Sequence, residues 1–261
     1  MKSKILWFLL IAIVLVSGCI SSTDNIKEDK VQPPKEKEVY KEEGGIISNN
    51  SNTIMVENVE LEWIRHASFK IKSGNIVIYT DPYKISNKSR REKADLILIT
   101  HDHFDHCDPK SVNAIKKDDT VVITTSNCKN KLGFGKTISE GDSITEKGVE
   151  IKAVSAYNIG KPYHPKGVGV GFVFKIGNQT IYQAGDTDKI PEMENLGKID
   201  IALLPIGGKY TMDAKEAAEA VALIKPKIVI PMHYGTLKDT PGNPEKFKEL
   251  VGDLAKVKIL G

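Results

Sequence analysis

The chain has 261 residues and a formal net charge of +3 at pH 7, and 27% of its residues are charged. Its apolar fraction of 40% is ordinary for a globular protein, and its length suits one larger domain with or without tails. The small net charge gives no sign of a nucleic-acid partner, so no binding of nucleic acid is expected.

The N-terminal residues do not fit a globular domain. Lys2 and Lys4 precede the apolar run Ile5–Val16, which is shorter than the ~20 residues that cross a bilayer. Its length and basic flank are typical of a secretory signal, and the next residues, VSGC, resemble the lipobox of prokaryotic lipoproteins. The resemblance implies a signal peptide over residues 1–18 and a lipid anchor on Cys19, on the extracytoplasmic face of the cell membrane. An uncleaved signal anchor is the alternative, and it predicts the same tethered location.

Residues 21–52 are rich in Lys, Glu, Ser, Asn and Pro and lack a periodic apolar face. Such a segment cannot bury enough apolar surface to offset the entropy lost on ordering. We therefore expect residues 19–52 to form a flexible tether that begins at the lipidated cysteine. The globular domain is expected over residues 53–261.

Short apolar runs with Gly or Pro between them predict the strands of this domain. The runs ADLILIT (residues 94–100) and TVVITTS (residues 120–126) have apolar centres without alternation, as in strands that are covered on both faces. The dipeptide Gly177-Asn178 predicts a hairpin turn between two strands. The other strands are expected at 59–66, 69–74, 75–82, 148–158, 169–178, 179–187, 199–208, 227–235 and 256–260.

Helices are expected later in the chain. Asp213 lies three residues before Glu216, which is the spacing of a capping box, and a second helix is expected over residues 244–254. Strands first and helices later favour two sheets with helices packed outside them.

The segment ITHDHFDHCDP, residues 99–109, follows one of the buried strands and holds three of the six histidines. If it begins extended, His101 and His103 point to the same side and both imidazoles reach one metal ion. If the chain then turns into a helix at Asp105, the side chains of Asp105 and His106 point toward a second position. Imidazole and carboxylate are the usual ligands of zinc and related metals, so this spacing predicts a metal site.

The sequence THDHFDH resembles the signature of the metallo-β-lactamase superfamily, and the similarity runs from about Glu60 to the C-terminus. This resemblance implies an α+β fold, the four-layer αββα sandwich, and further metal ligands at the ends of later strands. Asp186 in AGDTD resembles the carboxylate that bridges two metal ions, and His233 in IPMHYG resembles the last imidazole. His164 is the candidate for the remaining ligand, with a surface histidine in a Pro/Gly-rich loop as the alternative. Within the superfamily, the later motifs are most similar to the L-ascorbate-6-phosphate lactonase and N-acylphosphatidylethanolamine phospholipase D branch.

The expected activity is a metal-dependent hydrolysis. Two divalent ions, Zn²⁺ or alternatively Mn²⁺, would share a hydroxide that attacks an ester, lactone or phosphodiester, with Asp105 and Asp186 as the catalytic carboxylates. The expected partner is a small-molecule or lipid-like substrate. A non-catalytic metal- or partner-binding surface lipoprotein on the same fold is the alternative. The expected ligands of the first ion are His101, His103 and His164, those of the second are Asp105, His106 and His233, and Asp186 bridges them.

Other residues are expected to support this site. Asp81 follows a predicted strand and is placed to accept the second N–H of a metal-bound histidine. His66, in RHASF, is either an active-site histidine or a satisfied core histidine. Cys107 and Cys128 are expected to be buried free thiols rather than a disulfide, and Cys107 is not expected to bind metal.

Two Gly-rich loops, HPKGVGVG and PIGGKYTM, lie near the expected ligands, and two functions are open for them. Lys166, Lys209 and Tyr210 in these loops suit a phosphate or carboxylate. Equally, the glycines serve turns and the lysines solubility.

Overall fold

Two β-sheets face each other in the computed structural model, which describes residues 41–42, 46–85 and 92–261, with the backbone alone for 41–42 and 46–50. The described residues belong to the unit Val39–Gly261. The signal peptide, Cys19 and the first part of the expected tether lie outside them. None of the helices in the described ranges is both long enough and apolar enough to cross a bilayer.

The first sheet has nine strands, which pair in chain order. Strands β1 to β6 form an antiparallel meander, and β6 to β9 pair in parallel. Residues 46–50, which the sequence analysis included in the tether, form β2 and pair with β3. The bounds are β1 Lys41–Glu42, β2 Ile46–Asn50, β3 Thr53–Val56, β4 Val59–Arg65, β5 Ser68–Ser73, β6 Ile76–Thr80, β7 Leu96–Ile99, β8 Val121–Thr124 and β9 Lys136–Thr137.

The second sheet has seven strands and repeats this plan. Strands β10 to β13 are antiparallel, and β13 to β16 are parallel. The expected hairpin turn at Gly177-Asn178 joins β12 to β13. The bounds are β10 Ser143–Glu146, β11 Val149–Ala156, β12 Gly169–Ile176, β13 Gln179–Gln183, β14 Ile201–Pro205, β15 Ile228–Met232 and β16 Lys256–Val257.

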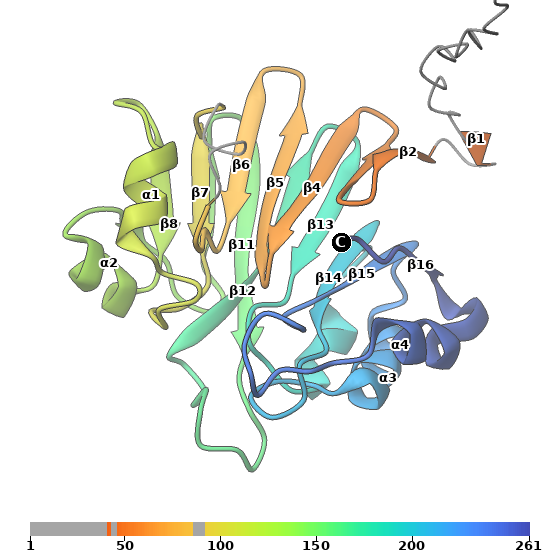
Figure 1. Ribbon diagram of the computed structural model, residues 1–261. Coiled ribbons are helices and arrows are strands. Elements are labelled where there is room, and N and C mark those ends of the chain that lie inside the picture. The colour runs from red at the N-terminus through yellow and green to blue at the C-terminus, as the bar shows by residue number, and fades with distance from the viewer. Residues whose placement is uncertain (1–40, 43–45, 86–91) are drawn as a thin grey trace, which may run out of the picture. The chain divides into compact units, whose positions relative to one another are not determined.

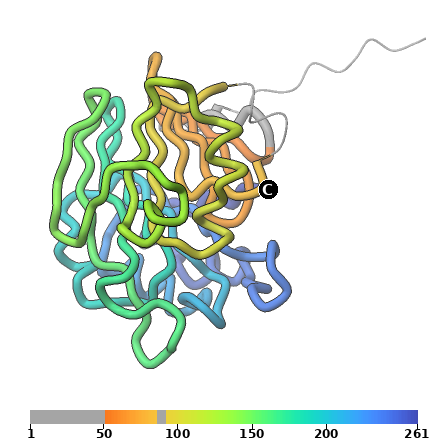
Figure 2. Tube along the Cα trace, turned by 90° about the vertical axis from the view of Figure 1, so that its left-hand side faces the viewer, coloured from red at the N-terminus to blue at the C-terminus, as the bar shows by residue number. Residues whose placement is uncertain are grey.

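Helices cover the outer faces of both sheets. Figure 1 shows α1 and α2 beside β7 and β8, and α3 and α4 beside β14 to β16, while Figure 2 shows the same chain trace turned by 90°. This arrangement is the four-layer αββα sandwich that the resemblance implied. The bounds are α1 Pro109–Ile115, α2 Ser126–Leu132, α3 Ala214–Ile224 and α4 Pro244–Val251, with 3-10 turns at Pro191–Asn195 and Gly252–Leu254.

Strand β7 shows why the continuous apolar runs are buried on both faces. Successive side chains of a strand point to opposite sides. Leu96 and Leu98 therefore belong to the core between the two sheets, whereas Ile97 and Ile99 pack with Val112 of α1 in a second cluster under the outer helices. Burial on both faces holds the end of β7, and with it the segment that follows, in a fixed position.

The helix expected at Asp105 begins four residues later, at Pro109. Residues 103–107 form a single turn, in which the His103 carbonyl accepts from the His106 N–H at 3.2 Å and from the Cys107 N–H at 2.8 Å. The Asp108 carboxylate caps α1 by accepting from the Lys110 N–H, and Pro109 occupies the first turn, where its missing N–H costs nothing. The capping box expected for α3 is present at Asp213 and Glu216.

Cys107 and Cys128 form a disulfide, so the expectation of two free thiols is wrong. Both residues are fully buried. Because β7 and β8 pair in parallel, their ends lie side by side, and Ile99 is opposite Thr124. Cys107 follows the first strand and Cys128 lies in the helix after the second, which brings their Cα atoms to 6.3 Å. The distance between these two Cα atoms depends on how β7 and β8 pair, which the local sequence does not show.

Candidate metal centre

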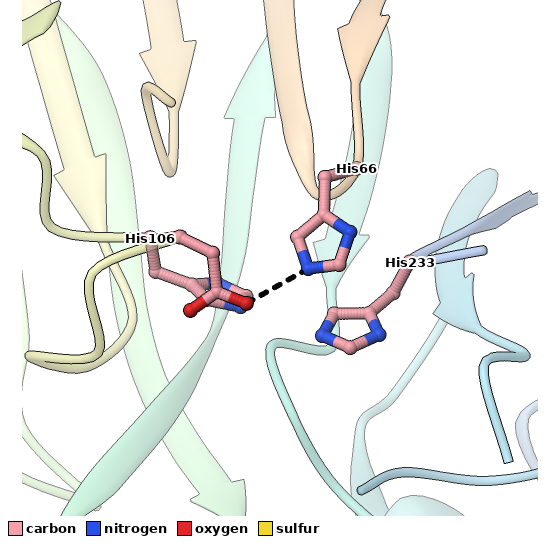
Figure 3. A group of neighbouring side chains, drawn as sticks. His66, His106 and His233 are labelled. Atoms are coloured by element: carbon pink, nitrogen blue, oxygen red, sulfur yellow. Dashed lines mark hydrogen bonds and ion pairs between the residues drawn. The ribbon is translucent and has the colours of Figure 1, made fainter. Parts of the chain in front are cut away.

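The expected ligands gather at one edge of the sandwich, where parallel strands of both sheets end. His101 follows β7, Asp186 follows β13 and His233 follows β15, while His164 lies in the loop between β11 and β12. The carboxyl ends of parallel strands are the usual place for a binding site in such folds. Figure 3 shows His66, His106 and His233, which come from separate segments of the chain, converging on one place.

Two groups of ligand atoms form there, and a third group, His101, His106 and Asp186, overlaps both. His101, His103 and His164 make the first ligand group, and His66, Asp105, His106 and His233 make the second. Within each group the nitrogen and oxygen atoms lie within 4.8 Å of one another. In the first group, His103 Nδ1 is 3.1 Å from His101 Nε2 and 3.2 Å from His164 Nε2. The structure thus brings together all seven residues expected as ligands and adds His66.

The Asp186 carboxylate lies between the two groups. Its Oδ2 atom is 3.2 Å from His164 Nε2 and 3.0 Å from His233 Nε2. Its Oδ1 atom is 3.2 Å from His106 Nε2. One carboxylate therefore faces imidazoles of both groups, which is the arrangement that a bridging ligand requires.

Asp81 orients two of the histidines, and the contact expected of it is confirmed. Its Oδ2 atom accepts from His106 Nδ1 and from the Thr100 hydroxyl, each at 2.9 Å. Because the Thr100 hydroxyl donates to Asp81, its oxygen is free to accept from His101 Nδ1 at 3.0 Å. Both imidazoles then carry their proton on Nδ1 and turn the lone pair of Nε2 toward the centre, as metal-binding histidines do.

His164 is held in the same way by a different residue. Its Nδ1 atom lies 3.0 Å from Asn158 Oδ1 and 3.1 Å from the Tyr210 carbonyl, both of which are acceptors. The His164 backbone N–H also donates to Asn158 Oδ1 at 3.1 Å, and the Asn158 N–H donates to the His164 carbonyl at 2.8 Å. The side chain is buried, so the alternative of a surface histidine is excluded.

His66 and His233 pack against each other in the second group. Their ring centroids are 3.8 Å apart, and the His233 N–H donates to the His66 carbonyl at 3.0 Å. His66 Nε2 contacts Asp105 Oδ2 at 3.0 Å, the contact drawn as a dashed line in Figure 3. Gly207 permits this placement, since a Cβ atom there would lie 2.4 Å from the His233 carbonyl oxygen.

The electrostatics of these side chains favour neutral imidazoles with one exception. Burial lowers the pKa of His101 and His103, and neighbouring imidazoles act in the same direction. Burial also lowers the pKa of His66 to about 4, against the hydrogen bond with Asp105. Neutral imidazole is the form that binds metal. Burial opposes the charged form of His106 too, but the carboxylates of Asp186 and Asp81 raise its pKa well above the usual value.

The two carboxylates of the centre remain ionised. Burial alone would raise the pKa of Asp105, but the hydrogen bond from His66 and the charge of His106 lower it. Burial is likewise outweighed at Asp186, whose pKa is lowered by His106 and His233. Ionised carboxylates beside neutral imidazoles are the donor set of zinc and its neighbours.

Buried atoms without partners show that a metal suits this centre. His106 Nε2, His233 Nε2 and Asp186 Oδ1 are buried and make no hydrogen bond within the described part of the chain. Such atoms are costly to bury, and a divalent cation would accept the lone pairs that they carry. A cavity of about 20 Å³ beside His101, His103, His164 and Asp186 has room for a single ion or water.

The lysines of the two Gly-rich loops are already paired. The Lys166 ammonium is 2.6 Å from Glu192 Oε1, and the Lys209 ammonium is 2.9 Å from Asp239 Oδ2. Their charges are thereby offset, which favours a role of these lysines in solubility over a phosphate site.

The role of His66 could not be decided from the sequence, because nothing in its local sequence shows that it contacts Asp105, 39 residues later.

Comparison with known proteins agrees with this geometry. Residues 60–233 match the family model described as "Beta-lactamase superfamily domain". A UPF0173 metal-dependent hydrolase of Thermococcus onnurineus is 38% identical over 223 residues, which cover 77% of this chain and 96% of the relative. One from Pyrococcus abyssi is 39% identical over 217 residues, with 77% and 96% covered.

Solved structures give the same result. A protein from Parabacteroides distasonis has a TM-score of 0.72 at 37% identity and covers 80% of this chain and 93% of its own. A metallo hydrolase from Ignicoccus hospitalis has a TM-score of 0.67 at 28% identity, with 77% and 94% covered. With its sandwich fold, its His/Asp centre and these relatives, the chain belongs to the metallo-β-lactamase superfamily, in the UPF0173 family of metal-dependent hydrolases.

Proposed function

We propose that this protein is a metal-dependent hydrolase whose centre holds two divalent cations, with Zn²⁺ as the expected metal and Mn²⁺ as the alternative. His101, His103 and His164 would hold one ion, and Asp105, His106 and His233 the other. Asp186 would serve both. The observation that carries this proposal is the Asp186 carboxylate, whose Oδ2 atom lies within 3.2 Å of an imidazole from each ligand group.

Two such ions would lower the pKa of a bound water and would stabilise negative charge that develops on a carbonyl or phosphoryl oxygen. The chain supplies the orientation. Asp81 orients His106 directly and His101 through the Thr100 hydroxyl, and Asn158 orients His164. In each of these histidines the Nδ1 proton is held and Nε2 faces the centre. Asp105 and Asp186 are the proposed catalytic carboxylates, since both stay ionised and would accept a hydrogen bond from the attacking water.

The substrate that we propose is an ester, lactone or phosphodiester. The motifs GDTD and IPMHYG support this class through their resemblance to the ascorbate-6-phosphate lactonase and phospholipase D branch.

The apolar run Ile5–Val16 and the sequence VSGC support a lipid anchor at Cys19, which would hold the enzyme on the extracytoplasmic side of the membrane. Replacing Cys19 with Ala should abolish incorporation of a labelled fatty acid, because the thiol that would carry the lipid is lost. Labelling that persists in this variant would contradict lipidation at Cys19.

The activity is tested on the purified protein by elemental analysis together with turnover of a generic carboxylic ester and a generic phosphodiester. We expect two bound ions per chain and turnover that a chelator abolishes and added Zn²⁺ or Mn²⁺ restores. Asp119→Asn, a change at an exposed ion pair with Lys147, is the control that should leave both readings unchanged. Two bound ions without chelator-sensitive turnover on either substrate would favour the alternative, a non-catalytic metal-binding lipoprotein.

A further inference from the structure

A cavity of about 420 Å³ opens directly above the metal centre. His103, Asp105, His164, Asp186 and His233 of the centre form one side of it. The residues Phe104, Tyr163, Tyr210 and Leu237 also line it and are here called the apolar wall. A substrate whose reacting bond reaches the centre must therefore lie against this wall.

Two side chains of the apolar wall are exposed to solvent. Phe104 is 62% exposed although it lies between two metal-ligand candidates, and Tyr163, beside His164, is 37% exposed. Among the described residues, four of the six large exposed apolar side chains lie in residues 101–106 or in the β11–β12 loop, namely Phe104, Ile159, Tyr163 and Val168, and of these Phe104 and Tyr163 line this cavity. Grouped exposed apolar side chains at a cavity mark a binding surface, whereas single ones are ordinary.

Ring contacts hold parts of the wall in place. Tyr163 and Tyr210 meet edge to face with centroids 4.7 Å apart, and Phe104 meets Tyr83 in the same way at 6.0 Å. These contacts join loops that are far apart in sequence. A wall that is already formed binds a ligand without the cost of ordering it.

The charges around the cavity do not suit a polyanion. Asp239 lines the cavity and accepts from the Lys209 ammonium and the Tyr210 hydroxyl. Lys161, in the loop next to Tyr163, is 2.7 Å from Asp188. Lys238 is then the one lysine that lines the cavity, and no ion pair to it is formed within the described ranges. Nucleotides and polyphosphates need several unpaired cations or a bidentate arginine.

We propose that the apolar wall binds a hydrocarbon group, an acyl or aryl chain attached to the bond that is cleaved, so that the substrate is a hydrophobic ester or lactone. This inference rests on the proposed function for the position of the reacting bond. It goes beyond that function by assigning Phe104, Tyr163, Tyr210 and Leu237 as the residues that select the substrate.

Binding of straight-chain carboxylates from acetate to octanoate to the metal-loaded protein tests this proposal by calorimetry. A carboxylate of this kind resembles the acid half of an ester and needs no turnover. We expect the affinity to rise by up to about fourfold for each methylene that leaves water. In Phe104→Ala and Leu237→Ala the gain per methylene should fall below about twofold, while Phe104→Leu, which keeps apolar surface, should restore most of it.

Leu250→Ala is the matched control, since Leu250 is 39% exposed and lines a different cavity near α4. It should leave the dependence on chain length unchanged. An affinity that does not depend on chain length, or a Phe104→Ala variant that behaves like Leu250→Ala, would overturn the proposal. Metal content is measured for each variant, because Phe104 lies between two ligand candidates. If Phe104→Ala loses metal, the test uses Leu237→Ala alone.

The outcomes separate this inference from the proposed function. Length-dependent binding without hydrolysis of any ester leaves the apolar wall standing and removes the hydrolase. Chelator-sensitive hydrolysis with no length dependence removes the wall and leaves the hydrolase.

Discussion

The two halves of the sandwich share one plan but supply their metal ligands differently. Each half is an antiparallel meander that continues into parallel strands with helices outside. The first half places four ligand candidates within six residues, from His101 to His106, after β7. The second half supplies His164, Asp186 and His233 from three separate loops. The ligand candidates from His101 to His106 are thus brought together by a few backbone turns. Those of the second half come together only when the whole second sheet has folded.

The halves also differ in how their ligands are fixed. The first-half loop is closed by the disulfide from Cys107 to Cys128 and by Asp81, which is fully buried. The second half relies on single contacts, such as Asn158 with His164 and the close approach of Gly207 to His233. The comparison predicts that changes in the second half remove individual ligands, while changes in the first half loosen several together.

The largest effect is expected from Asp186→Asn, which removes the one carboxylate that both ligand groups face. Turnover should fall by more than the hundredfold that marks loss of a partner that only orients a ligand. Bound metal should fall below two ions per chain, because the amide lacks the charge that offsets two cations. Elemental analysis and turnover of the ester measure both. Retention of two ions and of full turnover would show that Asp186 is not shared.

The next effect is on stability, and it belongs to the first half alone. Replacing Cys107 and Cys128 together by Ala should lower the free energy of unfolding by about 3 kcal/mol, the value for a loop of this length. Urea unfolding of the chelated protein measures it, so that bound metal does not contribute. The wild-type protein in reductant serves as the comparison and should lose a similar amount. A change of less than about 0.5 kcal/mol in both would mean that the bond does not hold the loop.

Metal affinity should distinguish the orienting residues of the halves. Asp81→Asn should weaken metal binding by about a hundredfold, because it disturbs both His101 and His106, and Asn158→Ala by about tenfold, because it disturbs His164 alone. Competition with a zinc indicator measures each affinity. Equal losses in the two variants would contradict the difference between a shared and a single orienting residue.

An effect as small as that of Asn158→Ala is expected at His66, which joins the halves through its contacts with Asp105 and His233. Its pKa of about 4 leaves it neutral at pH 7, so its Nε2–H donates to Asp105. His66→Ala should weaken metal binding by about tenfold with two ions still bound, and His66→Gln, which keeps a donor, should recover part of it. If His66→Ala binds only one ion per chain, His66 is itself a ligand.

These differences also explain what the sequence could predict. The contiguous motif from His101 to His106 predicted half of the centre because its geometry is local, and the apolar runs predicted the buried strands. The disulfide and the contact between His66 and Asp105 depend on how distant strands pair, and no local pattern encodes that distance. Helix α1 was expected to begin at Asp105 and begins at Pro109, and α2 was not predicted, since seven residues are too few to show a helical period. Strand β2 was assigned to the tether because IISNN lacks the alternation of a half-buried strand.

Asp81 has a consequence for how the protein takes up metal. Its single Oδ2 atom steadies His106 directly and His101 through the Thr100 hydroxyl. His101 belongs to the first ligand group and His106 to the second, and both also lie close to Asp186. Arrival of the first cation would stiffen this shared support and lower the entropic cost of ordering the neighbouring imidazole. We therefore expect a sigmoidal loading curve, in which chains with no ions and chains with both outnumber those with one.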